Sequence, residues 1–320
     1  MQGTAIAQPN IALIKYWGKR DVALNLPAVG SISITLRELH TRMHVIFEDG
    51  LDADTLTVND APDENMLPRL SACLDRVADQ DRPRARIASQ CNFPIAAGLA
   101  SSASSFAALT VAAAHAAGKS LTTAELASLA GQASGSAARS ILGGFVELTN
   151  TNGGIAVDSL CEADEWPFAV VVAITETGPK AVGSTAAMEI SRKTSPFYSN
   201  WVDQQAADLD TARAAIHDRD FARLARVAEH NCLKMHSIMW ASRPPMVYWN
   251  AATMRCLETV RSLQARDIGV FFTIDAGPQV KAVCLPEHAA DVEAALRKTQ
   301  GVEDIMVSGL GQGARLEAAT

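Results

Sequence analysis

The pattern of apolar and polar residues predicts strands in the first part of the chain, followed by an amphipathic helix. Residues 31–36 alternate and contain Ile and Thr, and residues 42–48 form a second β-like run, as expected of strands. Residues 67–77 instead carry apolar side chains at helical spacing, at Leu67, Leu70, Leu74 and Val77. The first half of the chain therefore combines strands with a few helices.

Small residues dominate the next region and mark two loops between helices. A Gly/Ser-rich loop at 94–105 precedes a helix-like stretch that ends at Gly118. Thr122 and Glu125 have the spacing of a capping box, which predicts the start of another helix. A second small-residue segment follows at 133–140.

The second half predicts a strand, three long helices, and then further strands with one helix. The predicted elements are a strand at 168–174, helices near 196–217, 220–241 and 247–265, strands at 269–274 and 280–284, a helix near 287–299 and a strand near Ile305. Strands precede helices in each half, which indicates an α+β fold rather than a doubly wound sheet. We expect two lobes, 1–165 and 166–320, with a firm interface because no Pro/Ser linker separates them.

Composition and charge narrow the class of protein. Hydrophobic residues make up 48% and charged residues 20% of the chain, which argues against disorder. A net charge of −7 and a pI of about 5.5 argue against a nucleic-acid partner. A site for an anionic ligand would therefore need a local cluster of Lys, Arg and backbone N–H groups.

The cysteine and histidine spacings predict no metal ligands. The six cysteines form no CxxC pair and the seven histidines no HExxH motif, so we expect reduced, buried thiols. His230 and His236 are interpreted as packing or surface residues. The sequence has no signal-peptide pattern and no apolar run of membrane-spanning length, so we expect a cytoplasmic protein without a membrane partner.

The loop at 94–105 offers the features of a phosphate site. Gly98 lets backbone approach a ligand closely, and Ser101 and Ser102 supply hydroxyls where a helix begins. Helix N-termini bind phosphate through their unpaired N–H groups. The loop lacks the Gly-Lys-Ser/Thr end of a Walker A motif, so a small-residue turn between packed elements is the alternative.

The segment at 10–21 combines an apolar strand with a group of cations. Lys15, Lys19 and Arg20 fall within six residues, beside Tyr16 and Trp17. A lysine at the end of a buried strand needs an anionic partner. The cluster therefore either holds a phosphate chain or is a solvated charge group after a strand.

Two further residues have isolated charges in unusual surroundings. Arg139 stands among Ala, Gly and Ser residues, which let the backbone come close to a guanidinium suited to carboxylate or phosphate. The alternative is an exposed arginine. Asp275 ends an apolar strand and precedes Gly277-Pro278, so it is either a turn former or a catalytic carboxylate.

Taken together, these segments resemble the diphosphomevalonate decarboxylase family, within the superfamily of galactokinase, homoserine kinase, mevalonate kinase and phosphomevalonate kinase. The resemblance covers most of the chain, and motifs in this order and spacing are highly specific. They are NIALIKYWGKRD at 10–21, FPIAAGLASSAS at 93–104, SGSAARS at 134–140 followed by GGFVE, the MHS…RPP stretch at 235–245, and DAGP at 275–278.

The resemblance implies a fold, a cofactor and an assembly. The N-terminal lobe would be of the ribosomal protein S5 domain 2 type and the C-terminal lobe ferredoxin-like, with the active site in the cleft between them. ATP and Mg²⁺ would bind there with a phosphorylated mevalonate as the small-molecule substrate. A homodimer is usual in the family.

The resemblance also implies roles for individual residues. Asp275 would orient or deprotonate the C3 hydroxyl, Arg139 would hold the carboxylate, and Lys15 would lie near the transferring phosphate. The nucleotide-binding residues would be Gly98, Ser101, Ser102 and Ser134. The substrate-binding residues would be Tyr16, Lys19, Ser136, Arg139 and Ser184.

The expected activity is ATP-dependent decarboxylation of mevalonate 5-diphosphate to isopentenyl diphosphate. Three departures from the family pattern bear on it: Gln279 replaces a usual Asn, Ser184 lacks a paired serine before it and an arginine after it, and 28–30 reads Ala-Val-Gly instead of a polar pair. The alternatives are a phosphomevalonate decarboxylase giving isopentenyl phosphate, a mevalonate-type 3-kinase, and a nucleotide-binding module without catalysis.

Overall fold

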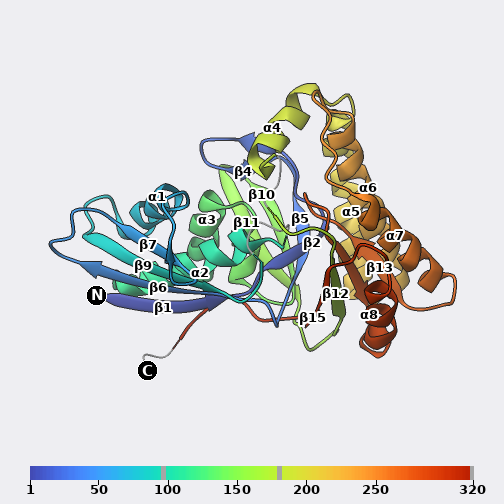
Figure 1. The fold of residues 1–320 in the computed structure, drawn as a ribbon. Helices are drawn as coiled ribbons and strands as arrows, with labels where there is room; N and C mark the ends of the chain where they lie inside the picture. The colour runs from blue at the N-terminus through green and yellow to red at the C-terminus, as the bar shows by residue number, and fades with distance from the viewer. Residues whose placement is uncertain (95–98, 179–181, 318–320) are drawn as a thin grey trace.

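The computed structural model describes residues 1–94, 99–178 and 182–317, which form two lobes side by side (Figure 1). This α+β architecture confirms the predicted fold class. The elements of the first lobe are β1 (Gln2–Ala7), β2 (Asn10–Ile14), β3 (Lys19–Asp21), β4 (Leu26–Pro27), β5 (Ser31–Thr35), β6 (Thr41–Glu48), β7 (Thr55–Val58), β8 (Ala61–Pro62), α1 (Leu67–Ala78), β9 (Arg84–Cys91), α2 (Ser101–Ala116), α3 (Thr123–Ala133), the 3₁₀ helix η1 (Ala137–Ile141), β10 (Phe145–Thr151) and β11 (Gly154–Cys161).

The remaining elements build the second lobe, apart from the last strand. They are β12 (Ala169–Ile174), α4 (Ser184–Thr194), α5 (Tyr198–His217), α6 (Phe221–Trp240), α7 (Ala251–Gln264), β13 (Val270–Thr273), β14 (Val280–Cys284), the 3₁₀ helix η2 (Pro286–His288), α8 (Ala289–Arg297), β15 (Asp304–Gly309) and β16 (Arg315–Leu316).

The Ala-rich helix α2 packs against the larger sheet of the first lobe, whose order is β16-β1-β6-β9-β7-β8. Its small side chains let the helix backbone come close to β1. A Cβ atom at Gly3 of that strand would lie only 2.2 Å from the Ala112 carbonyl oxygen. The composition of α2 therefore serves close helix-to-sheet packing, which interiors need to reach their normal density.

The sheet of the second lobe has the order β13-β14-β12-β15, and each neighbouring pair is antiparallel. This is the split β-α-β order of the predicted ferredoxin-like lobe. On one face Val171 and Phe272 pack with Val260 of α7 and Leu296 of α8. The sheet thus holds β14 as an interior strand, which matters for the site described below.

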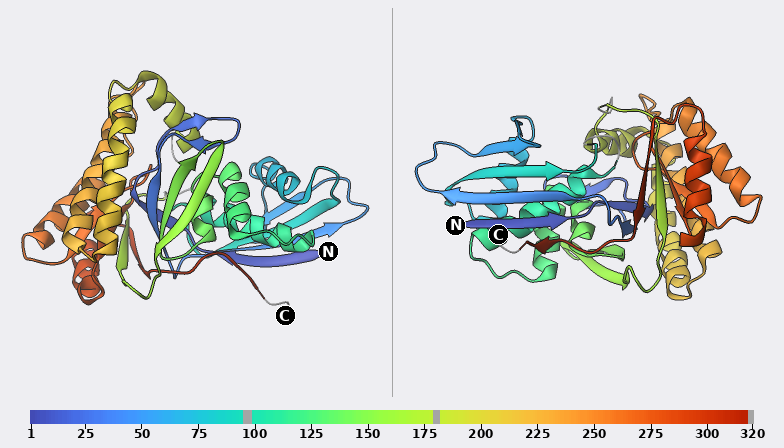
Figure 2. Two further views of the ribbon diagram at one scale, coloured as in Figure 1. Left: turned by 180° about the vertical axis from the view of Figure 1, so that it is seen from behind. Right: turned by 60° about the horizontal axis from the view of Figure 1, so that its bottom comes forward.

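One hydrophobic core joins the two lobes. Ile11, Ile34 and Phe145 of the first lobe form a single buried cluster with Val170 and Phe271 of the second. The chain also crosses back, because β16 pairs with β1 of the first lobe (Figure 2). The predicted boundary between the lobes, near residue 165, falls between β11 and β12 and stays a prediction. The second part of the chain is not confined to its own lobe, because its last strand joins the N-terminal sheet.

A buried ion pair in the first lobe gives a prediction about stability. The Arg82 guanidinium donates to both Asp54 carboxylate oxygens, at 3.0 and 2.7 Å, and the two side chains are only 2% and 5% exposed. Asp54→Asn is expected to lower the free energy of unfolding by about 2–3 kcal/mol, because the buried guanidinium then relies on the partly exposed Asp75 carboxylate, 2.8 Å away, as its counter-charge. Urea unfolding at neutral pH measures the loss.

The pH dependence of that loss has a defined sign. Burial opposes ionisation of Asp54, but hydrogen bonds from Arg82, Ser71 and the Ala85 amide lower its pKa to about 2. The stabilisation is therefore complete above about pH 4, the unfolded-state value, and disappears as the pH falls toward 2. Asp79→Asn is the control, since its exposed pair with Lys119 contributes less than about 1 kcal/mol. Equal losses in both variants would contradict the prediction.

Candidate active site

A cavity of about 980 Å³ lies where elements of both lobes meet, and its lining is strongly cationic. Within the described residues, the charged side chains that line it are Lys15, Lys19, Arg69, Arg76, Arg139, Glu189 and Asp275. Five cations therefore face two carboxylates in a chain whose net charge is −7. This local excess of positive charge is what an anionic ligand requires.

Asp275 lies at the centre of the charged groups, just after β13. Its Oδ1 accepts a hydrogen bond of 2.7 Å from Lys15 Nζ, and its Oδ2 is 3.4 Å from Lys281 Nζ. The Lys15 side chain is 1% exposed and that of Asp275 24% exposed. The carboxylate is thus fixed by buried lysines while one part of it still reaches the cavity.

Lys15 is positioned by a network of buried amides from the second lobe. The Lys15 backbone N–H donates to Asn231 Oδ1 at 2.7 Å, and Gln205 Nε2 donates to the Lys15 carbonyl at 2.8 Å. Asn231 in turn donates to Gln205 Oε1 at 2.9 Å and to Asp208. Both backbone groups of Lys15, just after the end of β2, are hydrogen-bonded. The side chain that carries the ammonium group therefore extends from a fixed backbone position.

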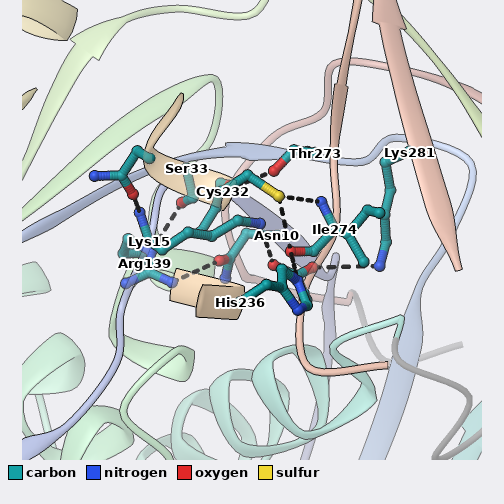
Figure 3. Close-up of polar contacts among 12 residues, drawn as sticks. Asn10, Lys15, Ser33, Arg139, Cys232, His236, Thr273, Ile274 and Lys281 are labelled. Carbon is teal, nitrogen blue, oxygen red and sulfur yellow. Dashed lines mark hydrogen bonds and ion pairs between the residues drawn. The ribbon is translucent and has the colours of Figure 1, made fainter. Parts of the chain in front are cut away.

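Arg139 is held at three of its nitrogens on η1. Nε donates to Ser33 Oγ at 2.9 Å and Nη2 to Asn10 Oδ1 at 3.2 Å (Figure 3). Nη1 donates to Ser31 Oγ at 2.5 Å. Burial lowers the pKa of this guanidinium to about 10, against the opposing effects of Tyr16 and Asp275. Arg139 therefore stays charged at neutral pH and presents a fixed fork to the cavity.

Tyr16 presents a hydroxyl that suits a phosphate oxygen. Burial raises its pKa to about 12, so the phenol remains a proton donor. Among the described residues, none forms a hydrogen bond with its buried Oη, although Tyr16 lines the cavity. Gly135 makes room for the ring, because a Cβ atom there would lie 2.6 Å from Oη.

Two of the predicted nucleotide serines, Ser102 and Ser134, lie side by side in the cavity lining, and Ser101 precedes Ser102 on the same helix. Helix α2 begins at Ser101 after Ala100, whose φ of 54° is left-handed and sharply turns the chain. Ser134 Oγ lies 3.4 Å from Ser102 Oγ and 3.5 Å from Ser136 Oγ. A helix N-terminus with adjacent hydroxyls is a suitable phosphate site. Gly98 lies outside the described residues.

Lys19 and Ser184 both line the cavity, and Lys19 contacts the residue that follows Ser184. Lys19 Nζ donates to Thr185 Oγ1 at 3.4 Å, and Ser184 is the first residue of α4. Burial, followed by the repulsion of Arg69, lowers the pKa of Lys19. The structure therefore brings the predicted residues that it describes, from Lys15 to Asp275, to one region around the cavity.

Several residues of the site were not predicted individually. Arg69 and Arg76 of α1 add charge to the lining, while Asn10, Ser31 and Ser33 hold Arg139. Lys281 touches Asp275 from a strand. Its signal was available in the sequence, because a lysine inside the apolar run 280–284 needs a charged partner. The two serines gave a weaker signal, because residues two apart on a strand share one face.

The lining fits a magnesium nucleotide better than a metal bound by the protein alone. Within the described residues, no group of three or more His, Cys, Asp or Glu side chains could hold a metal ion. Mg²⁺ commonly keeps several waters and binds through the phosphates of its nucleotide. The cations, serine hydroxyls and α2 N-terminus match those phosphates rather than the metal.

The cleft combines a carboxylate held by lysines, a fixed arginine and a helix N-terminus suited to phosphate. These features define an enzyme that acts on small polyanions. Residues 7–161 match the diphosphomevalonate decarboxylase-like N-terminal domain, and residues 170–314 match the mevalonate 5-diphosphate decarboxylase C-terminal domain. The chain belongs to the diphosphomevalonate decarboxylase family.

Individual relatives agree along nearly the whole chain. The diphosphomevalonate decarboxylase of Schizosaccharomyces pombe is 34% identical over 318 residues, which cover 90% of this chain and 80% of the relative. The crystal structure of mevalonate diphosphate decarboxylase from Staphylococcus aureus superimposes with a TM-score of 0.93 at 35% identity, covering 99% and 98% of the two chains. A structure of MDDEF in complex with MVAPP, AMPPCP and magnesium has a TM-score of 0.92 at 32% identity, covering 100% and 99%.

No helix in the described part of the chain is long and apolar enough to cross a bilayer.

Proposed function

We propose that this chain catalyses the ATP-dependent decarboxylation of mevalonate 5-diphosphate to isopentenyl diphosphate. The observation that carries the proposal is the Lys15–Asp275 pair of 2.7 Å in a cationic cavity that also presents Arg139. A carboxylate, a cation beside it and a guanidinium fork are the three groups that this reaction requires. The family membership supports the same substrate.

Asp275 is the base in this proposal. Its carboxylate accepts the proton of the C3 hydroxyl while the C3 oxygen bonds to the terminal phosphorus of ATP, and the electron pair of the broken P–O bond remains on ADP. Lys15, which lines the cavity beside Asp275, offsets the negative charge of the transferred phosphate. Holding both reactants in the cleft provides the positioning on which phosphoryl transfer depends.

Arg139 holds the substrate carboxylate from binding through the second stage. The C3–O bond breaks and its electron pair leaves with phosphate. The electrons of the bond between C1 and C2 then form the C2–C3 double bond, and C1 departs as CO₂. Arg139 fixes the substrate carboxylate beside C3 through the part of its guanidinium that faces the cavity. It must not stabilise the bound substrate more than the transition state in which the carboxylate leaves.

The phosphate groups of both substrates have separate partners in the proposal. The α2 N-terminus with Gly98, Ser101, Ser102 and Ser134 holds the ATP phosphates. The terminal phosphates of the acid contact Tyr16, Lys19, Ser136 and Ser184. Magnesium accompanies ATP and supplies charge neutralisation between the phosphates when bound. We also propose a cytoplasmic homodimer, as the family resemblance implies.

Two departures from the family pattern favour the monophosphate substrate as a second candidate. Val29, in the stretch where the family has a polar pair, is 5% exposed and packs in an apolar cluster with Trp17, Met188 and Trp201. Thr185, where some members have arginine, accepts a hydrogen bond from Lys19. Both departures place a smaller or less polar side chain beside Trp17 or Lys19, which line the cavity near the proposed site of the distal phosphate. Gln279 instead binds the main chain at Thr175 and Glu176, so it supports the strand end.

Product analysis tests the proposal. Purified protein is incubated with ATP, Mg²⁺ and either mevalonate 5-phosphate or mevalonate 5-diphosphate, and ADP, CO₂ and the isopentenyl product are measured. Turnover of the diphosphate supports the proposal, and turnover mainly of the monophosphate supports the second candidate. ADP without CO₂ would instead indicate a 3-kinase, and binding without either product a nucleotide-binding module.

A further inference from the structure

Lys281 occupies a position that suits an apolar residue. It lies in β14, between Val172 of β12 and Thr273 of β13, and is 0% exposed. Its neighbours Val280 and Ala282 point to the opposite face, into the core formed with α7 and α8. Burying an ammonium group is costly unless an opposite charge compensates it. A lysine at this position therefore calls for a specific use of its charge.

The charge of Lys281 is directed at Asp275. Its Nζ lies 3.4 Å from Oδ2, while Lys15 Nζ lies 2.7 Å from Oδ1. Figure 3 shows the two lysines reaching the same point from opposite sides. Lys15 belongs to the cavity lining. Lys281, fully buried, stays behind the carboxylate, where solvent and ligand do not reach it.

The other ionisable groups near Asp275 come from α6 and η1. Burial lowers the pKa of His236 to about 3, so its imidazole is neutral at physiological pH. Burial likewise raises the pKa of the Cys232 thiol, which stays protonated. Arg139 on η1 also acts on Asp275 through its charge. Among the described residues, Lys15 and Lys281 form ion pairs with this carboxylate.

We propose that Lys281 is a positioning residue that keeps Asp275 ionised and oriented when Lys15 turns from it to the phosphate being transferred. This inference rests on the proposed function, in which Lys15 has two anionic partners during one turnover. With Lys281 in place, Asp275 retains a permanent counter-charge that no ligand can compete for. The carboxylate then remains a competent base at the moment when Lys15 serves the phosphate.

The first test compares Lys281→Met, which fills the same volume without charge, with Lys281→Arg and with the control Lys119→Met, whose lysine is partly exposed. We expect Lys281→Met to lower kcat by about 10- to 100-fold with little change in the Kd of ATP. The acidic limb of its pH–rate profile should move to higher pH by about one unit or more, since a carboxylate without its cation is harder to ionise. Lys281→Arg should restore part of both.

The second test needs no turnover and follows the melting temperature in a double-mutant cycle. In the wild-type background Lys281→Met should lower the melting temperature, because Asp275 loses a counter-charge. In the Asp275→Asn background the same substitution should raise it, because it removes a buried charge that no longer has the Asp275 carboxylate beside it. The proposal would be overturned if Lys281→Met shifted the melting temperature in the same direction in both backgrounds. The same criterion applies if the Lys281→Met single variant folds poorly.

The outcomes separate this inference from the proposed function. If the wild-type protein releases no CO₂, the proposed function fails, whatever the melting cycle reports about the Lys281–Asp275 contact. If the wild type is active and Lys281→Met has a normal kcat, the inference fails alone. A lower kcat with an unmoved acidic limb would assign Lys281 a structural role and would also overturn it.

Discussion

Asp275→Asn is expected to lower the rate of CO₂ release by about 10³-fold while ATP still binds. Asparagine has nearly the same shape, but its amide cannot accept the C3 proton. The nucleotide groups, Ser101, Ser102 and Ser134, lie on other elements and remain in place. Single-turnover assays with ATP and the diphosphate substrate measure the chemical step, and calorimetric titration measures nucleotide affinity.

Asp304→Asn is the matched control for this experiment. Asp304 also lies at one terminus of a strand, as the first residue of β15, and its Oδ1 accepts a hydrogen bond from the Ile305 backbone N–H. It is exposed and lies away from the charged residues that line the cavity, so its variant should keep full activity. Normal product release by Asp275→Asn would rule out Asp275 as the base. Loss of ATP binding would show that the substitution disturbs more than the proton transfer.

Arg139→Lys is expected to reduce kcat/KM for the acid substrate by about 10²- to 10³-fold. Lysine keeps the charge but not the planar fork, so it cannot bond Ser33, Ser31 and Asn10 and still present a fixed donor to a carboxylate. Because the substrate then binds without its carboxylate fixed, ADP and CO₂ formation should fall together. Steady-state assays that follow both products check this.

Arg213→Lys is the control for the arginine fork. Arg213 makes a bidentate pair with Glu147 at 3.0 and 2.7 Å, on elements away from the cavity. Its variant tests the general effect of losing a bidentate arginine, and it should leave kcat/KM near the wild-type value. If Arg139→Lys were as active as Arg213→Lys, the carboxylate would have to be held by another group.

Much of the fold could be predicted because the strongest patterns coincide with packed elements. The run 168–174 became β12, which is buried along its whole length, and the patterns from 196 to 265 became α5, α6 and α7. Helix α4 was not predicted. It buries only Ala187, Met188 and Ser191, so its apolar face is too narrow to stand out. The hydrophobic periodicity therefore could not predict that a helix begins at the cavity here.

The site could be predicted where a charge stands among apolar or small residues. Lys15 and Asp275 lie 260 residues apart in the sequence. Each can be recognised because it is a charged residue that directly follows an apolar run. What could not be predicted is which strands become neighbours. Arg139 finds Ser31 and Ser33 because β5 lies between β2 and β10, and Lys281 finds Asp275 because β14 pairs with β13. Such pairings depend on tertiary packing rather than on local sequence.

The contrast between an acidic exterior and a cationic cleft governs how ligands are captured. A polyanion that approaches a molecule of net charge −7 gains no long-range attraction, and at physiological salt the potential fades within about 8 Å. The five cations around the cavity act only over the last few ångströms. Encounter is therefore governed by diffusion rather than by electrostatic steering, and the charge of the cleft prolongs residence once the ligand has arrived.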